Sequence, residues 1–336
     1  MVENRPAMKR FLIVLSLLAC TAAFSACSGS AVAPIVQSHS GVAAPRVGPV
    51  ATSKRIIYYY QTQYNNGVYV SLAPVWKTKN PNTGLPYTTD LIIAAFHLGY
   101  DSNNQPYIHL NDNVPSDPMF DVMWPQVHRL QHLGITTRMM LGGAAQGSYA
   151  DLFAHWTTFY PILRQTLKHY RLNGIDLDVE ENVTLPQIER LINKLHTDFG
   201  SSFYITLAPV SSALTNGANL SGFSYPALYS SKVGPDIAWF DTQFYSGFGT
   251  LGNPTDYTNV INYGYPPDVV VAGMIANPFD SSGFVAMSTV ENTVTSLVGT
   301  YPTFGGVFAW EYFNALPGGT ANPGEWSQAF GQAMGL

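Results

Sequence analysis

The sequence predicts an α/β protein, a single (β/α)8 TIM barrel, on three observations. Eight short apolar or β-branched runs follow residue 54, helical patterns separate several of them, and together they fill residues 54–336. Strands that alternate with helices favour a parallel sheet, and eight such units in a region of this length match the barrel. A doubly wound sheet is the alternative, but it usually has a glycine-rich first turn, and Tyr58-Tyr59-Tyr60-Gln61 is not one.

Each predicted strand is an apolar run that ends in small or polar residues. In chain order the strands are 56–60, 91–97, 136–141, 174–180, 203–207, 237–245, 269–274 and 306–310. Helices are predicted over 120–133, 152–170, 186–199 and 285–297. In the third of these, Ile188, Leu191, Ile192 and Leu195 recur at the spacing that places them on one face of a helix.

The composition limits the kind of partner. The chain is 46% hydrophobic and 13% aromatic but only 11% charged, against about 25% charged in an average soluble protein. A disordered chain needs the opposite balance. The net charge of −5 argues against a nucleic-acid partner. Because the polarity comes from Asn, Ser, Thr, Gly and 20 Tyr residues, a neutral, hydroxyl-rich ligand suits this surface.

Residues 1–27 have the pattern of a secretory signal peptide. A basic start at Met8-Lys9-Arg10 precedes an apolar run over 11–19, which is too short to span a bilayer comfortably, and small residues then lead to Cys27. Residues 24–28 resemble a bacterial lipobox with Cys27 as the lipidated residue, and ordinary cleavage near Ala26 is the alternative. We expect a secreted protein, or a bacterial periplasmic or outer-surface lipoprotein tethered to the membrane through Cys27.

Residues 28–53 are rich in Ser, Ala, Val, Pro and Gly and are predicted to form a flexible linker. The predicted barrel domain is then 54–336, which we expect to be a monomer. Cys20 and Cys27 are the only cysteines, so this domain has no internal disulfide and no cysteine metal site.

Residues 172–181 carry the chemistry. Side chains on a strand alternate between its two faces, so Asp176, Asp178 and Glu180 share one face while the apolar residues between them share the other. If the apolar face packs against the outer helices, the carboxylates point into the barrel. Carboxylates this close cannot all ionise, so at least one pKa must rise. Glu180 comes last and therefore lies at the C-terminal mouth, where barrel enzymes place catalysis.

The stretch Asn173-Gly174-Ile175-Asp176-Leu177-Asp178-Val179-Glu180 resembles the Asp-Gly-x-Asp-x-Asp-x-Glu motif of glycoside hydrolase family 18, the chitinases and endo-β-N-acetylglucosaminidases. The first position departs from the motif, because Asn173 replaces Asp. Asn173 has the opposite parity to the three acids, so we expect the change to affect structure more than chemistry.

Three further segments support the resemblance in the right strand order. Met140-Leu141-Gly142-Gly143 is similar to the Ser-x-Gly-Gly end of the third strand, with Met140 in place of Ser. Gln243-Phe244-Tyr245 is similar to the sixth-strand motif of the plant class III chitinase branch. Residues 305–310 are similar to the eighth strand, whose tryptophan lies under the sugar.

The resemblance implies a retaining, substrate-assisted hydrolysis of β-1,4-linked N-acetylglucosamine chains, an exception to the two-carboxylate scheme. Glu180 would be the general acid and base. Asp178 would orient the acetamide of the sugar, and Asp176 would share a proton with Asp178. Tyr245 and Gln243 would hold the acetamide. No metal and no organic cofactor is implied. Glu181 faces the other way by parity and is excluded from catalysis.

The resemblance also implies substrate-binding residues at the mouth. Trp310 would stack under the sugar at the cleavage site. Tyr58, Phe96, Gly142 and Gly143 are further candidates, because each lies at or near the end of a predicted strand.

Several alternatives stay open. The acids could belong to a solvated edge strand; a calcium loop fits poorly, because no Gly stands at its sixth position and no Glu at its twelfth. Residues 247–252 match Gly-x-Gly-x-x-Gly, but Asn253-Pro254 follow and we expect a loop with no helix there. The rival functions are an endo-β-N-acetylglucosaminidase acting on N-glycan chitobiose cores and a sugar-binding lectin without catalysis.

Overall fold

The computed structural model describes residues 54–336. The predicted signal peptide (1–27), Cys27 and the predicted linker (28–53) lie outside these residues.

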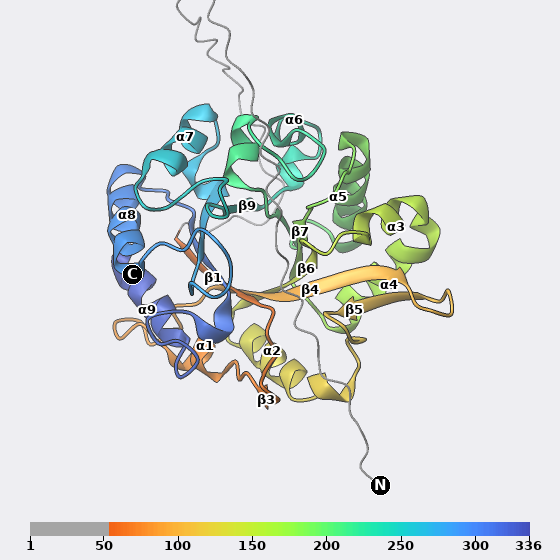
Figure 1. Ribbon diagram of the computed structural model, residues 1–336, viewed down its shortest axis with the longest axis horizontal. Helices are drawn as coiled ribbons and strands as arrows, with labels where there is room; N and C mark the ends of the chain where they lie inside the picture. The colour runs from red at the N-terminus through yellow and green to blue at the C-terminus, as the bar shows by residue number, and fades with distance from the viewer. Residues whose placement is uncertain (1–53) are drawn as a thin grey trace, which may run out of the picture. The chain divides into compact units, whose positions relative to one another are not determined.

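The described chain forms a closed barrel of eight parallel strands surrounded by helices (Figure 1). The barrel strands are β1 (Arg55–Tyr60), β4 (Asp90–Tyr100), β6 (Thr136–Gly142), β7 (Gly174–Asp178), β8 (Tyr204–Leu207), β9 (Trp239–Gln243), β10 (Val270–Ile275) and β11 (Gly306–Trp310). The barrel closes because β1 pairs with β11 on one side and with β4 on the other. All eight predicted strands are present, so the predicted (β/α)8 architecture is confirmed.

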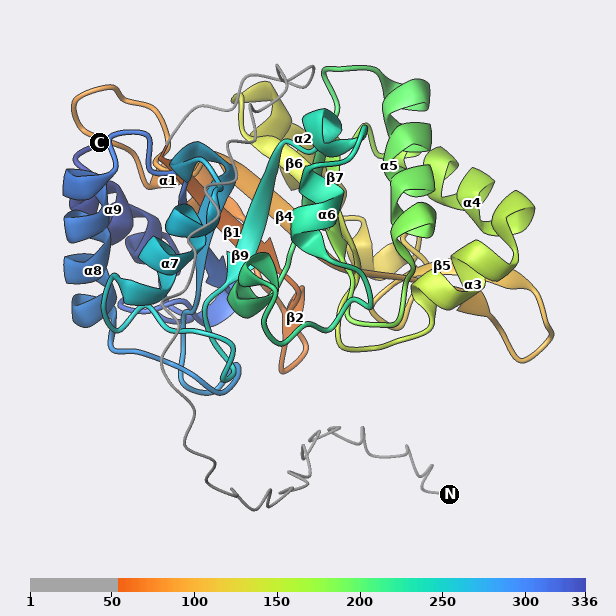
Figure 2. The same ribbon diagram turned by 90° about the horizontal axis from the view of Figure 1, so that it is seen from above.

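Helices cover the outside of the barrel, as the view from above shows (Figure 2). They are α1 (Ala73–Lys77), α2 (Met123–His132), α3 (Ser148–Ala154), α4 (Trp156–His169), α5 (Leu185–Phe199), α6 (Tyr225–Tyr229), α7 (Thr255–Tyr263), α8 (Met287–Thr300) and α9 (Gly324–Ala333). Short 3-10 turns occupy 118–120, 211–215, 234–236, 267–269 and 312–314.

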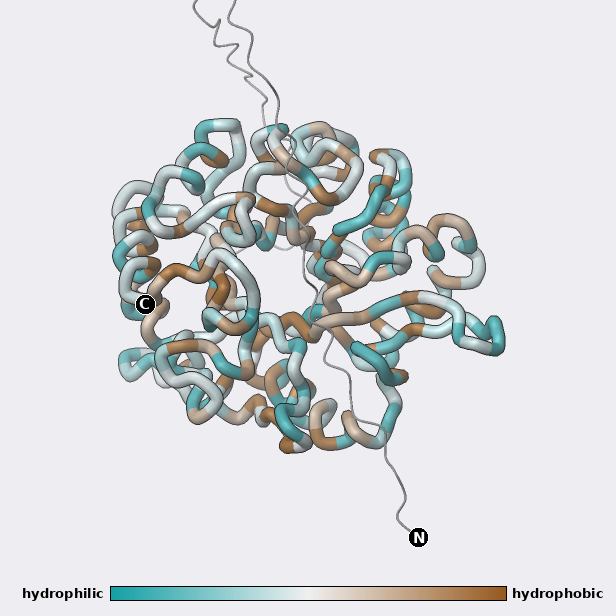
Figure 3. Tube along the Cα trace, viewed as in Figure 1, coloured by the Kyte–Doolittle hydropathy of each residue, from teal (hydrophilic) through white to brown (hydrophobic). Residues whose placement is uncertain are grey.

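Three short strands lie outside the barrel proper, two of them in a separate sheet. In β2 (Tyr64–Asn65) and β3 (Val68–Tyr69) the chain makes a short hairpin after β1. In β5 (Pro106–Leu110) it folds back antiparallel to the long end of β4. The connection between β4 and β5 is hydrophilic and projects from the barrel (Figure 3).

The best-predicted helix, α5, has a clear local cause at both ends. The Thr184 and Gln187 side chains form a capping box at its start, and Gly200, with a positive φ of 80°, follows its last residue. The apolar stripe of this helix is fully buried. Amphipathic spacing and caps therefore agree with each other, and the predicted helix over 186–199 is confirmed.

Two helix predictions need correction. The single helix expected over 152–170 is two helices, α3 and α4, separated at His155, whose φ and ψ are not helical. A helix, α7, also begins at Thr255, directly after Asn253-Pro254, where none was expected. A proline is compatible with a helix start, because the N–H that it lacks has no partner within the helix there.

No helix between residues 54 and 336 is both long enough and apolar enough to cross a membrane.

Candidate functional site

Strand β7 carries the carboxylates into the barrel. Its apolar residues Ile175 and Leu177 are completely buried. Asp176 is also completely buried, Asp178 is 5% exposed, and Glu180, two residues past the strand's end, is only partly buried. The three acids therefore run from the depth of the barrel to its C-terminal mouth, as the alternation predicted. An exposed edge strand is ruled out by this burial.

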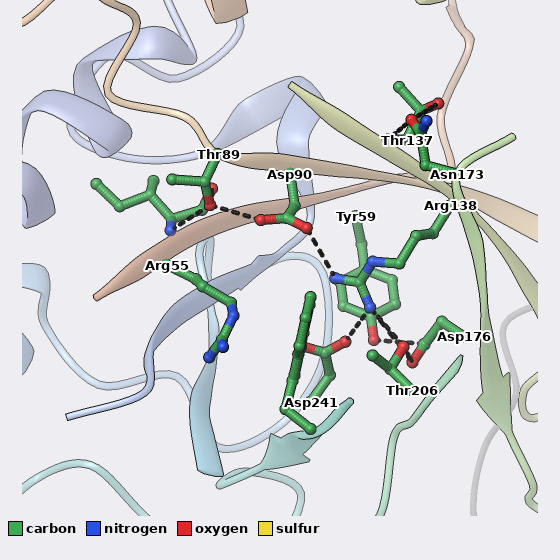
Figure 4. Close-up of polar contacts among 12 residues, drawn as sticks. Arg55, Tyr59, Thr89, Asp90, Thr137, Arg138, Asn173, Asp176, Thr206 and Asp241 are labelled. Carbon is green, nitrogen blue, oxygen red and sulfur yellow. Dashed lines mark hydrogen bonds and ion pairs between the residues drawn. The ribbon is translucent and has the colours of Figure 1, made fainter. Parts of the chain in front are cut away.

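Asp176 lies in a ring of hydrogen-bond donors (Figure 4). The Tyr59 hydroxyl donates to Oδ2 and the Thr206 hydroxyl donates to Oδ1, each at 2.7 Å. Burial and the charge of Asp241 raise the pKa of Asp176 to about 7, although the two hydroxyls and Arg138 favour its ionised form. Asp176 can therefore gain or lose a proton near neutral pH.

Asp178 and Glu180 also have raised pKa values. Burial is the main cause for both, and for Asp178 the charges of Glu180 and Asp176 add to it. The Gln243 amide opposes both shifts by hydrogen bonding; its Nε2 lies 3.3 Å from Asp178 Oδ1. A second bond, from Nε2 to the Ala208 carbonyl at 2.8 Å, fixes this amide in place. The expectation that at least one pKa must rise is confirmed.

Two aromatic residues, Tyr245 and Trp310, lie close to the carboxylates or to their partners. Burial, together with the charges of Asp178 and Glu180, raises the pKa of Tyr245 well above its ordinary value, so its hydroxyl stays protonated and can donate. Its ring meets Phe308 of β11 edge-on, at 6.3 Å between centroids. Trp310 ends β11 partly exposed, with its ring centroid 5.5 Å from that of Tyr59.

Gly142 and Gly143 lie directly beside β7. Both have a positive φ, 96° and 95°, and the Gly143 N–H donates to the Asp178 carbonyl at 2.9 Å. A Cβ on Gly142 would lie 2.3 Å from that same carbonyl oxygen, and one on Gly143 would lie 3.5 Å from Asp178 Oδ2. At Gly142 only glycine fits, because a Cβ there would overlap the Asp178 carbonyl oxygen, and at Gly143 the positive φ favours glycine.

A buried charge network that was not predicted from the sequence lies beneath these acids. Arg138 on β6 lies 2.7 Å from Asp241 on β9, 3.7 Å from Asp90 on β4 and 4.0 Å from Asp176. Although burial lowers the pKa of Arg138, the carboxylates of Asp241, Asp90 and Asp176 raise it above its ordinary value. The guanidinium also stacks over Trp239, 4.6 Å from the ring centroid. Strand alternation could have predicted this network, because Arg138 lies on the same face of its strand as Met140 and Asp241 on the same face as Gln243.

Glu311, the residue after Trp310, was missed as well. It is buried and accepts hydrogen bonds from the Gln61 and Thr62 N–H groups at 3.1 and 2.9 Å and from the Thr62 hydroxyl at 2.6 Å. It thereby ties the end of β11 to the end of β1. Burial raises its pKa to about 7.

The prediction that Tyr58 and Phe96 bind substrate is wrong. Tyr58 faces outward, because its hydroxyl donates to the Pro323 carbonyl at 2.7 Å and its ring packs on Trp326 of α9. Tyr59 is the inward residue of this strand. Phe96 has no exposed surface and belongs to the hydrophobic core, so a ligand cannot touch it.

Two structural assignments from parity are confirmed. The Asn173 side chain accepts from the Thr137 N–H at 2.9 Å and so joins the start of β7 to β6. The Glu181 carboxylate accepts from the N–H groups of Gly147, Tyr149 and Ala150, where α3 begins. Glu181 thus anchors a helix start and does not face the barrel interior.

The chain was compared with known proteins, and no family model matches it. A fungal endo-β-N-acetylglucosaminidase of glycosyl hydrolase family 18 is 40% identical in sequence, with a TM-score of 0.76, over 83% of this chain and 97% of that protein. The chain belongs to glycoside hydrolase family 18. It is accordingly a chitinase-like glycoside hydrolase.

Further matches agree with this family assignment. A chitinase from Aspergillus fumigatus is also 40% identical, with a TM-score of 0.73, over 84% of this chain and 99% of that one. "Chitinase 2" of Rhizopus oligosporus is 28% identical over 160 residues, which span 45% of this chain but only 27% of that protein. These similar proteins are fungal, and membership of the plant class III branch stays a prediction.

Proposed function

We propose that this family 18 enzyme hydrolyses β-1,4-linked N-acetylglucosamine chains, with Glu180 as the general acid and base. The observation that carries the proposal is the pairing of a partly buried Glu180 at the barrel mouth, just past the end of β7, with the buried Asp178 on β7 below it. A general acid must hold its proton near the working pH, and burial gives Glu180 a raised pKa.

The reaction needs no nucleophile from the protein. The acetamido oxygen of the substrate attacks the anomeric carbon while Glu180 donates its proton to the leaving glycosidic oxygen, so that bond breaks as the oxazolinium ring forms. Glu180, now ionised, then takes a proton from water, which attacks the same carbon and opens the ring. The product keeps the configuration of the substrate.

Asp178 is positioned to support the acetamide. As a carboxylate it accepts the acetamide N–H and stabilises the positive charge that develops on the ring. Asp176, held by Tyr59 and Thr206, takes up or releases a proton as the charge on Asp178 changes. Two titratable carboxyls in one buried column can divide their protons in this way.

Three other residues complete the proposed site. The Tyr245 hydroxyl donates to the acetamido oxygen, and Gln243, fixed by the Ala208 carbonyl, helps to hold the same group. Trp310 lies under the sugar ring as a partly exposed platform. Gly142 and Gly143 keep the approach to Asp178 free of side chains.

The test is product analysis on N-acetylglucosamine oligomers, in which the β-anomer should appear first. Glucose oligomers with the same β-1,4 linkage lack the acetamide and should not be cleaved. Their hydrolysis at a comparable rate would contradict acetamide participation.

A second substrate is supported by one observation. The similar endo-β-N-acetylglucosaminidase and the similar chitinase match this chain at equal identity, 40% each. The rival substrate is therefore the chitobiose core of N-glycans. Digestion of chitin oligomers beside a high-mannose glycoprotein separates the two, and tight binding with no product from either would support a lectin.

We also propose that the enzyme is exported. The support is the signal-peptide pattern of residues 1–27. If Cys27 is lipidated, the full chain should fractionate with membranes and Cys27→Ser should release it.

A further inference from the structure

The loop between β10 and α8 carries an unusually exposed aromatic residue. Phe279 is 93% exposed, whereas the next most exposed large hydrophobic side chains in the described chain, Val68 and Leu85, are 70% and 63% exposed. A ring left almost entirely in water adds no packing to the folded protein, and both of its faces are free to stack on a ligand.

This loop bridges the two aromatic residues of the proposed site. On one side, the Ala276 N–H donates to the Trp310 carbonyl at 2.7 Å, directly before the turn that holds Phe279. On the other side, the Ser246 N–H donates to the Ser282 carbonyl at 3.2 Å, next to Tyr245. Phe279 therefore lies on the rim of the mouth, in the segment that spans from Tyr245 to Trp310.

The turn itself is fixed by polar contacts. The Asn277 side chain accepts from the Phe279 N–H at 3.1 Å and donates to the Asn314 carbonyl at 3.0 Å. The Asp280 carboxylate accepts from the Glu311 N–H at 3.2 Å and from the Asn314 amide at 2.6 Å. The exposed ring thus stands on a preorganised backbone that is bound to the residues following Trp310. Ordering it on binding costs little conformational entropy.

From this geometry we propose that Phe279 is a second sugar-binding platform, on which a pyranose ring of the substrate chain stacks outside the position that Trp310 lines. The apolar C–H face of a pyranose matches the face of an aromatic ring in the way that aromatic anchors match apolar surfaces. A platform on the rim favours long substrates, because only in a long chain do sugar rings lie far enough from the scissile bond to reach it. The inference rests on the proposed function and adds a preference for long substrates.

The test compares N-acetylglucosamine oligomers of increasing length on wild type, Phe279→Ala and Phe279→Trp. For Phe279→Ala, the ratio of its KM to that of wild type should grow with chain length, reaching about 3- to 10-fold for the longest oligomers, the range expected from one lost aromatic contact. Phe279→Trp keeps an aromatic ring at this position and should have the same KM as wild type. Leu85→Ala, which removes another exposed apolar side chain just before the start of β4, should leave every KM unchanged.

Binding gives an independent readout. In a Glu180→Gln background, which removes hydrolysis, calorimetric titration of the longest soluble oligomer should show a loss of affinity of the same size when Phe279→Ala is added. Equal KM values at all lengths together with unchanged binding would overturn the platform and leave the proposed function intact. A wild-type enzyme that cleaves no oligomer, and a Glu180→Gln variant that binds none, would overturn both.

Discussion

The Arg138 guanidinium lies 2.7 Å from the Asp241 carboxylate inside the barrel, and neither side chain has exposed surface. Two buried charges lose their hydration, and their mutual attraction replaces it only while both are present. Asp241→Asn keeps the shape but leaves Arg138 short of negative charge. We expect a loss of about 3–5 kcal/mol in the free energy of unfolding, the usual cost of breaking a buried pair, measured by denaturant titration.

A surface ion pair provides the control. Asp198 bridges Arg164 and Lys194, whose side chains are 41% and 43% exposed. Solvent and salt screen such contacts, so Asp198→Asn should cost about 0–1 kcal/mol. If the two variants unfold at the same denaturant concentration, the buried network does not stabilise the barrel more than a surface contact does.

Strands β7 and β1 show which inward-facing residues could be predicted from the sequence. Parity on β7 placed the acids correctly, because three acids alternate with apolar residues and only one phase is possible. In β1 every residue is buried, since one face packs on helices and the other fills the barrel. Because a run of three tyrosines has no alternating polar residue that marks the inward face, the sequence does not distinguish Tyr58 from Tyr59, which is the inward residue.

Contacts between distant strands were harder still to predict. Arg138 and Asp241 stand 103 residues apart, and their pairing follows from barrel closure and register. The motif predicted Asp176 as a member of the site, but its hydroxyl donors come from β1 and β8. Recognising the eight strands gave the fold, whereas the environment that sets each pKa needed the three-dimensional arrangement.

Thr206 is predicted to set the pH range of activity through Asp176. Its hydroxyl donates to Asp176 at 2.7 Å and favours the ionised form. Thr206→Val removes this donor, so the pKa of Asp176 rises and the protonated carboxyl persists to higher pH. The proton that Asp176 shares with Asp178 is then lost at higher pH, so the alkaline limb of the kcat/KM profile should move to higher pH.

The matched control for this variant is Thr206→Ser, which keeps the hydroxyl and should keep the wild-type profile. A Thr206→Val profile that coincides with that of wild type, or that moves to lower pH, would contradict the proposal that Asp176 shares a proton with Asp178.

Glu311 is predicted to make stability fall as the pH rises. Burial raises its pKa from the ordinary 4.5 to about 7, so between these values the folded protein holds a proton that the unfolded chain has released. Stability that depends on this proton is complete below pH 4.5 and is lost as the pH rises through 7. Glu311→Gln cannot titrate. Its amide oxygen can still accept from the Gln61 and Thr62 N–H groups, and its NH2 can donate to the Thr62 hydroxyl oxygen.

Thermal unfolding between pH 5 and pH 8 checks this prediction. The Tm of wild type should fall across the range, with a shallower fall in Glu311→Gln. Part of the slope should remain, because the pKa values of Asp176, Asp178 and Glu180 are raised as well. An unchanged slope in the variant would show that Glu311 is already ionised in the folded protein at low pH.

Glu180 and Glu181 are adjacent, but Glu180 is predicted to be the general acid and Glu181 to stabilise the start of α3. Glu180→Gln has no proton to donate to the leaving oxygen, and loss of a general acid typically costs about 10²- to 10⁴-fold in rate. We expect kcat to fall by at least that much while the affinity for a chitin oligomer stays within a few-fold of wild type. Glu181→Gln weakens the contacts to the start of α3, so its Tm should drop by a few degrees while kcat is retained. Steady-state kinetics, oligomer titration and thermal unfolding on the two variants decide the matter: near-wild-type turnover in Glu180→Gln, or an inactive but stable Glu181→Gln, would reverse the assignment.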